Sequence, residues 1–266
     1  MPDLWSDLLG CLDLTPADSD AGWTAPNQTL DYHRVFGGQI LGQFIVAAQL
    51  TCPDKSVKSV HTQFAKQGRA DTEMRFDVQR HHEGRTFATL TITARQDTDV
   101  VATAAVSMHA REGGPDHQSV APVPGPPGPE HAVTIGLIPW EIRTAIDIDD
   151  EGVGPPDFEM WMRTPAVVAD LAPALAAYAT DLTLIGTALR PVDGASQRGS
   201  RTAFASAVTS HTVWFHRPFV TDSWLLLRQH SPVLAHARAF GRGDILTEQG
   251  SLVASYAQES LIRFAG

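Results

Sequence analysis

Residues 36–50, FGGQILGQFIVAAQL, constrain the fold of this chain more than any other stretch. Two glycines open the stretch, and its apolar residues then recur with i, i+1, i+4 and i+5 spacing, which predicts an amphipathic helix over residues 39–50. The sequence Cys-Pro-Asp at 52–54 ends this helix. The first recognisable unit is therefore one long helix that buries an apolar face.

Strand-like segments follow this helix, and the same order returns in the second half of the chain. β-Branched residues and alternating polarity predict strands at 57–65, 74–81, 86–96 and 100–109. In the second half, helical compositions at 165–178 and 181–189 precede predicted strands at 203–216, 223–230, 235–246 and 252–263. A helix followed by a run of antiparallel strands, used twice, predicts an α+β fold in which a curved sheet wraps around a helix.

Short internal echoes favour a duplication. The dipeptide His-Thr at 61–62 recurs at 211–212, and residues 100–106 resemble residues 252–258 at nearly the same offset. Each echo lies at the same place within its half of the chain. We therefore interpret the chain as two unequal copies of one unit.

A composition shift separates the two copies. Residues 111–130 hold six prolines and four glycines, which excludes a helix or a central strand. Such a segment predicts an extended linker. We expect an N-terminal unit at 1–112, a Pro/Gly-rich linker at 113–135 and a C-terminal unit at 136–266.

Composition and charge narrow the class of protein. The 266 residues include 20 basic and 30 acidic side chains, and the net charge of −10 argues against a nucleic-acid partner. The two cysteines, Cys11 and Cys52, form no CxxC pair and indicate reduced thiols. The N-terminus carries acid where a signal peptide carries base, and the longest uncharged stretch, 35–53, is too polar to span a bilayer. We expect a cytoplasmic protein without a membrane span.

Sharp signatures of cofactor and metal chemistry are absent from the sequence. It contains no phosphate-binding P-loop, no glycine-rich dinucleotide fingerprint and no HExxH. We therefore expect neither a cofactor nor a metal site.

A few positions remain as candidates for chemistry. Gly37 and Gly38 leave N–H groups at a helix start that could polarise a carbonyl, or they simply let the helix pack closely. Asp181 opens a predicted helix and is either an N-cap or a functional carboxylate. Gln258 lies mid-strand where its repeat mate is Val106, and a buried amide at such a position needs a partner.

These motifs together resemble the acyl-CoA thioesterase II (TesB-like) family. The most specific element is WFHRPF at 214–219, at this distance before VAS-x-x-Q at 253–258; taken alone, the aromatic and basic cluster would also fit a core segment with a surface arginine. The resemblance extends from about residue 30 to residue 264. It is carried by residues 35–43, 161–163, 177–182, 214–219 and 253–259.

The resemblance implies a fold and an activity. The fold is a double hotdog, in which two long helices are each wrapped by a curved antiparallel sheet. The activity is hydrolysis of fatty acyl-CoA to a free acid and CoA by an activated water, without a cofactor. By the same resemblance, Asp181 is the base, Gln258 positions the water, and Gly37 and Gly38 bind the thioester carbonyl.

The sequence departs from the family at one catalytic position. The family hydroxyl falls on Val208, and the family aspartate two residues later falls on Ser210. The adjacent Thr209 faces the other side of a regular strand, so it can complete the site only through a bulge. We keep Thr209 as the candidate hydroxyl. The alternative is a catalytically silent double hotdog that binds acyl-CoA or lipid.

Two expectations concern partners. Double hotdogs commonly associate because their sheet edges and outer faces need cover, so we expect a homo-oligomer. The phosphates of CoA need cationic partners, for which Arg217, Arg163 and Lys66 are candidates.

Overall fold

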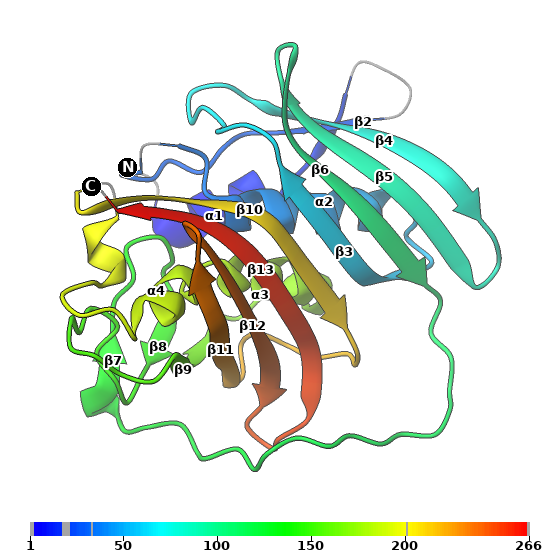
Figure 1. Cartoon of the computed structure of the whole chain (residues 1–266). Helices are drawn as coiled ribbons and strands as arrows, with labels where there is room; N and C mark the ends of the chain where they lie inside the picture. The colour runs from blue at the N-terminus through cyan, green and yellow to red at the C-terminus, as the bar shows by residue number, and fades with distance from the viewer. Residues whose placement is uncertain (1–2, 18–21, 33, 201, 265–266) are drawn as a thin grey trace.

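A single antiparallel sheet organises the computed structural model, which describes residues 3–17, 22–32, 34–200 and 202–264. The sheet curves strongly, so that one face is concave (Figure 1). Within the described residues it has 13 strands. Their order across the sheet is β1 (Thr15–Pro16), β2 (Gly22–Ala25), β4 (Met74–Glu83), β5 (Phe87–Gln96), β6 (Asp99–His109), β3 (Ser56–Phe64), β10 (Phe204–Phe215), β13 (Leu252–Phe264), β12 (Arg238–Thr247), β11 (Leu225–Ala235), β9 (Asp157–Arg163), β8 (Glu141–Arg143) and β7 (Ala132–Val133).

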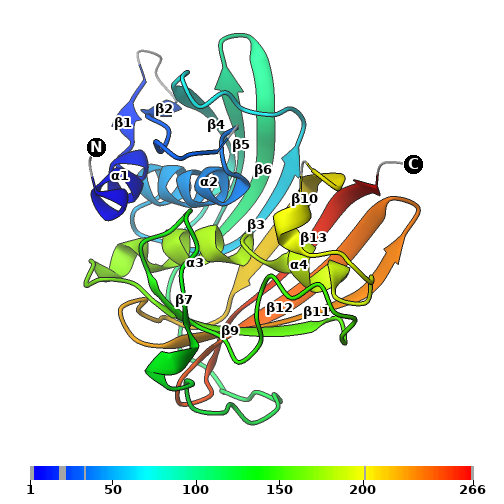
Figure 2. The same ribbon diagram turned by 90° about the vertical axis from the view of Figure 1, so that its left-hand side faces the viewer.

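The main helices lie on the concave side of this sheet. Figure 2 shows α2 and α3 side by side there, with α4 continuing beyond α3. The α-helices are α1 (Leu4–Cys11), α2 (Gly37–Thr51), α3 (Ala172–Thr180) and α4 (Leu184–Leu189). The described residues also hold short 3-10 turns at η1 (Pro129–His131), η2 (Ala169–Leu171) and η3 (Gln197–Gly199).

The burial pattern explains why these elements form. Every residue of α2 from Gly38 to Ala48 is buried, including Gln39 and Gln43, so the expectation of one buried apolar face is wrong and the helix is enclosed on all sides. Strand β5 alternates, and its buried residues Ala88, Leu90, Ile92 and Ala94 face the helices. The concave face of the sheet and the two helices therefore share one hydrophobic core.

Strands β3 and β10 join the two halves of the sheet. They pair antiparallel, with residues 59–63 opposite residues 210–214. The α+β architecture of helices wrapped by a curved antiparallel sheet, predicted from the sequence, is confirmed.

Most predicted elements are present, and the differences have local causes. The helix predicted at 39–50 and the eight predicted strands are found with small shifts of their ends. The helix predicted at 165–178 begins only at Ala172, with Pro173 in its first turn, where proline is tolerated. The helix predicted at 181–189 begins only at Leu184. Prediction missed α1 and the short strands β1, β2, β7, β8 and β9.

The echo between His61 and His211 is not a structural equivalence. His61 is exposed, whereas His211 is completely buried, so the two rings point to opposite faces of the sheet. The other echo fits the register better. Val106 lies opposite Val60, as Gln258 lies opposite His211, and all four side chains are buried.

The Pro/Gly-rich segment is extended and tied to the second half of the sheet. Residues 110–128 form no helix or strand, and η1 and β7 follow at 129–133. The side chain of Gln118 donates to the Gly250 carbonyl and accepts from the Leu252 N–H. Figure 1 shows this green segment passing below the sheet before the chain reaches β7.

One helical stretch has the length and composition of a membrane span. It covers Ala169–Leu189, and an 18-residue window within it has a mean hydropathy of 1.2 and is 78% buried inside the protein. A core helix has the same character, and α3 packs against α2. The stretch therefore serves as core in this structure.

Gly38 is expected to be intolerant of a side chain. A Cβ there would overlap the Tyr178 carbonyl oxygen and the Phe36 ring, whereas a Cβ at Gly113 would meet nothing within 4 Å. We predict that Gly38→Ala lowers the free energy of unfolding by about 1–3 kcal/mol, the usual range for overpacking. Gly113→Ala is the matched control and should leave it within about 0.5 kcal/mol. Urea unfolding of both variants tests this, and equal stabilities would contradict the packing described.

Candidate functional site

Asp181 lies at the break between α3 and α4. It is the residue that ends α3, with helical backbone angles, and Thr183 is the residue that precedes α4. Of the two alternatives for Asp181, the N-cap is therefore wrong, because Leu182 and Thr183 still precede the start of α4. Only 8% of Asp181 is exposed. Its carboxylate is buried and does not satisfy the start of α4.

The first turn of α2 surrounds this carboxylate. A Cβ built on Gly37 would lie 2.6 Å from Oδ2 of Asp181, and the Gly38 N–H donates to the carboxylate. The start of a helix presents unsatisfied N–H groups and a partial positive charge. The structure thus brings Gly37, Gly38 and Asp181 together, although they are far apart in the sequence.

Burial gives this carboxyl group an unusual proton affinity. Desolvation raises the pKa of Asp181 from 3.8 to about 7, while the charge of Arg34 and the Gly38 N–H oppose the rise. The other oxygen, Oδ1, is buried and has no hydrogen-bond partner among the described residues. A carboxyl group with a pKa near neutrality and a free oxygen is suited to exchange a proton with a bound molecule.

A cavity of about 450 Å³ opens beside Asp181. One part of its wall is apolar and includes Val35, Phe36, Ile40, Phe64, Leu137, Leu182 and Ile185. Another part is polar and includes Tyr32, Arg34, Lys66, Gln67, Gln197, Ser200, Ser206 and Thr209. Gly37 also lines the cavity, so the start of α2 faces both Asp181 and the cavity.

Arg34 is a cavity residue that the sequence reasoning missed. Its guanidinium donates to the Tyr32 hydroxyl at 3.3 Å and to the Ser206 carbonyl at 3.2 Å. These contacts hold a positive charge at the wall that also contains Asp181. Its position directly before Val35 and the Phe-Gly-Gly motif was the available signal.

A β-bulge brings Thr209 to the cavity. The register between β10 and β13 shifts between Val208 and Ser210, and both Val208 and Thr209 line the cavity. The Thr209 hydroxyl donates to the Glu259 carbonyl at 3.0 Å. The Thr209 oxygen can therefore act only as a hydrogen-bond acceptor toward a molecule in the cavity.

Gln258 is engaged by other side chains. Its Oε1 lies 2.8 Å from Nδ1 of His211, and its Nε2 donates to Ser260 Oγ at 2.8 Å. His211 in turn contacts Thr180, the residue before Asp181. Gln258 is thus linked to Asp181 through His211 and Thr180.

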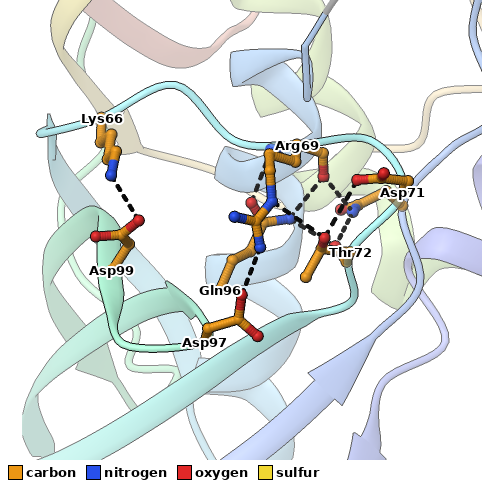
Figure 3. Close-up of polar contacts among 8 residues, drawn as sticks. Lys66, Arg69, Asp71, Thr72, Gln96, Asp97 and Asp99 are labelled. Atoms are coloured by element: carbon orange, nitrogen blue, oxygen red, sulfur yellow. Dashed lines mark hydrogen bonds and ion pairs between the residues drawn. The ribbon is translucent and has the colours of Figure 1, made fainter.

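Lys66 lies on a wall segment that is tied to the turn between β5 and β6. Figure 3 shows Lys66 paired with Asp99 at 2.5 Å and Arg69 paired with Asp97 at 2.6 Å. In the same view Gln96 accepts from the Arg69 N–H and donates to the Arg69 carbonyl, both at 2.7 Å. These contacts fix the segment, and the charge of Lys66 at the cavity rim is already partnered.

The other predicted cationic residues lie away from Asp181. Arg217 pairs with Asp116, and Arg163 pairs with Glu141. Residues 215–219 of the aromatic and basic cluster line a separate cavity of about 750 Å³. The structure therefore does not bring this cluster to the candidate site.

Clusters of metal-ligating side chains and cysteine thiols are the remaining groups that could carry chemistry. No group of three or more His, Cys, Asp or Glu side chains there could hold a metal ion. Cys11 and Cys52 are buried as free thiols, and burial raises the pKa of each.

Known proteins are similar to this chain in sequence and in fold. The acyl-CoA thioesterase N-terminal domain profile matches residues 25–109, and the corresponding C-terminal domain profile matches residues 111–262. The chain is 29% identical to Acyl-CoA thioesterase 2 of Haemophilus influenzae over 100% of both chains. It is 27% identical to human Acyl-coenzyme A thioesterase 8, over 95% of this chain and 87% of that protein.

Solved structures agree with these matches. A TesB protein of Mycobacterium avium subspecies paratuberculosis aligns with a TM-score of 0.81 at 29% identity, over 97% of this chain and 98% of that chain. A protein with a hot dog fold from Alicyclobacillus acidocaldarius aligns with a TM-score of 0.75 at 18% identity, over 97% and 98%. The hotdog architecture expected from the sequence is thereby confirmed.

We predict that the difference in stability between the parent and Asp181→Asn depends on pH. The pKa of Asp181 is higher in the folded protein than in the unfolded chain, so its neutral form stabilises the fold below about pH 4 and this contribution is lost as the pH rises to about 7. The Asp181→Asn variant cannot ionise at this position, so its free energy of unfolding does not fall in this way as the pH rises. Between pH 4 and pH 8 the variant should therefore gain a few kcal/mol in free energy of unfolding relative to the parent. Denaturant titrations at several pH values test this, and a constant difference would contradict a raised pKa.

Proposed function

Because the chain belongs to the acyl-CoA thioesterase family, we propose that it hydrolyses fatty acyl-CoA to a free acid and CoA, with Asp181 as the general base. The observation that carries this proposal is the buried carboxylate of Asp181, which has a free Oδ1 and lies against the first turn of α2. A base with a pKa near the working pH is the most effective at accepting a proton from water.

The proposed reaction is a direct attack by water. Asp181 takes one proton as the water oxygen forms a bond to the thioester carbonyl carbon, and the carbonyl oxygen becomes an oxyanion. Collapse of this intermediate breaks the C–S bond and releases the CoA thiolate, which is protonated by the proton that left the water. A thiolate is a good leaving group, so no covalent enzyme intermediate is required.

The two glycines have separate proposed tasks. The Gly38 N–H already donates to Asp181, whereas Gly37 lines the cavity at the first position of α2. We assign the Gly37 N–H to the developing oxyanion, where a preorganised donor at a helix start is most effective. Gly38 then holds the base in place.

Thr209 is the proposed hydroxyl of the site. Its own proton goes to the Glu259 carbonyl, so its oxygen can accept the second proton of the water. With one proton directed to Asp181 and the other to Thr209, a lone pair of the water would point at the substrate. Gln258 belongs to the proposed site as a positioning residue.

The remaining expectations stay proposals. We propose that the protein acts in cytoplasmic lipid metabolism, that its units are 1–112 and 136–266 joined by 113–135, and that it forms a homo-oligomer. An exposed apolar pair supports the last point, since Val233 on β11 lies opposite Phe240 on β12 and both are exposed. Larger contiguous apolar patches of this kind mark interaction surfaces, and this pair would be part of one.

The variant Asp181→Asn tests the proposed base. Asp181→Asn should lower kcat for thiol release at least a hundredfold across short, medium and long acyl-CoAs, because the amide cannot accept the proton. Binding of acyl-CoA by calorimetry should persist. If the variant hydrolysed acyl-CoA as fast as the parent, Asp181 would not be the base. If the parent bound acyl-CoA but released no thiol, the silent-binder alternative, motivated by Val208, would hold.

Variants of Val208 and Thr209, the two neighbouring residues at the bulge, test which of them occupies the hydroxyl position. Thr209→Val removes the oxygen proposed to accept from water and should lower kcat about tenfold or more. Val208→Thr, the matched change at the family hydroxyl position, should stay within about twofold of the parent because Thr209 already supplies the hydroxyl. Steady-state kinetics of both variants decide this. A faster Val208→Thr together with an unaffected Thr209→Val would reassign the hydroxyl to position 208.

A further inference from the structure

His211 occupies a completely buried position between the sheet and the end of α3. Its Nε2 lies 2.9 Å from the Thr180 hydroxyl, and its Nδ1 lies 2.8 Å from Oε1 of Gln258. The ring stacks on Tyr256, with 6.2 Å between the centroids and 8° between the planes. Three independent contacts therefore hold the imidazole in one orientation.

The contacts define the protonation of this histidine. Burial lowers the pKa of His211 to about 4, so the ring is neutral at ordinary pH. The Gln258 carbonyl can only accept, so Nδ1 carries the proton and Nε2 offers a lone pair to Thr180. The single Thr180 hydroxyl proton is then shared between Nε2 at 2.9 Å and the Ala177 carbonyl, to which it donates at 2.7 Å. Gln258 thus selects the tautomer in which Nε2 is an acceptor beside the Thr180 hydroxyl, together with the Ala177 carbonyl.

A second buried amide holds the other side of the helix break. Oε1 of Gln229 accepts from the Thr183 and Thr187 hydroxyls at 2.9 and 2.8 Å. The Nε2 group of Gln229 donates to the Tyr256 hydroxyl at 2.9 Å. Tyr256 therefore contacts both His211 and Gln229. The residues on each side of Asp181 are anchored to the sheet through one shared aromatic residue.

This arrangement differs from a site in which the glutamine touches the water. The Gln258 carbonyl is directed at His211, and its amide nitrogen is directed at Ser260. Both polar atoms of the Gln258 side chain therefore contact buried partners. Among the described residues, the contacts of Gln258 lead to Asp181 through His211 and Thr180, which precedes Asp181 in the chain.

We propose that His211, oriented by Gln258, is a positioning residue that fixes Thr180 and thereby holds the Asp181 carboxylate against the first turn of α2. The inference rests on the proposed function for its kinetic consequence. It deepens that function because it gives Gln258 an indirect role and assigns His211 a role of its own. Displacement of a catalytic group by about 1 Å costs as much as a hundredfold in rate, so anchoring of this kind has kinetic weight.

A double-mutant cycle tests the proposal. The variants are His211→Phe, Gln258→Leu and the double variant, assayed for kcat, KM and the pH dependence of kcat/KM. Each single change should lower kcat about tenfold to a hundredfold with KM within about twofold. The double variant should be no slower than the slower single variant, because both residues act along one path. His211→Gln, which can still accept from Thr180, should recover part of the rate.

The pH profile separates positioning from general support of the fold. Release of Thr180 would let water reach Asp181, so the midpoint of the acid limb should fall by about one unit or more. Thr164→Val is the matched control, since it breaks a buried hydroxyl pair with Thr221 at 3.0 Å away from the site. The control should lower the melting temperature and leave kcat and the midpoint unchanged.

Specific outcomes would overturn the proposal. If the losses of the two single variants multiply, Gln258 acts on the water itself. If His211→Phe behaves like Thr164→Val, His211 is only structural. Failure of the proposed function is distinguishable, because Asp181→Asn would then retain activity. In that case the Asp181 carboxyl carbon, titrated by NMR in the parent and in His211→Phe, still reports the positioning, and an identical pKa in both would refute it.

Discussion

The contact between the first turn of α2 and the last turn of α3 is the constraint on which the rest of the structure depends. Gly38 carries no side chain, so the backbone of α2 approaches the Tyr178 carbonyl at this point. The chain leaves α3 at Asp181, and its carboxylate therefore falls among the N–H donors at the start of α2. The core packing of two helices and the geometry of the candidate site are thus the same feature.

Burying this acid works against folding, and its surroundings offset the cost only in part. The Gly38 N–H and the charge of Arg34 favour the ionised form, yet desolvation prevails and the pKa rises to about 7. A core built for stability alone would satisfy both carboxylate oxygens, but Oδ1 has no partner in the described part of the chain. An unsatisfied carboxylate oxygen and a pKa near neutrality cost folding free energy, and the same two properties suit the group to proton transfer.

Local patterns made the fold predictable and left the site partly hidden. The helix at 39–50 and the long strands could be predicted because the hydrophobic periodicity of each segment depends only on its own residues. Asp181 could be selected through the resemblance carried by residues 177–182, but its place at a helix break could not, because the neighbouring Thr180 and Thr183 contact His211 and Gln229, which are distant in sequence. Likewise, Thr209 reaches the cavity through a bulge that is set by the pairing of β10 with β13.

We propose that a buried aspartic acid, held at a helix start, titrates near neutrality and serves as the base. The most direct measurement is an NMR titration of the Asp181 carboxyl carbon in the parent protein, compared with the pH dependence of kcat/KM. We expect a pKa of about 7 and a kinetic midpoint that coincides with it. A pKa near 4, or a kinetic midpoint far from the titration of this group, would contradict the account.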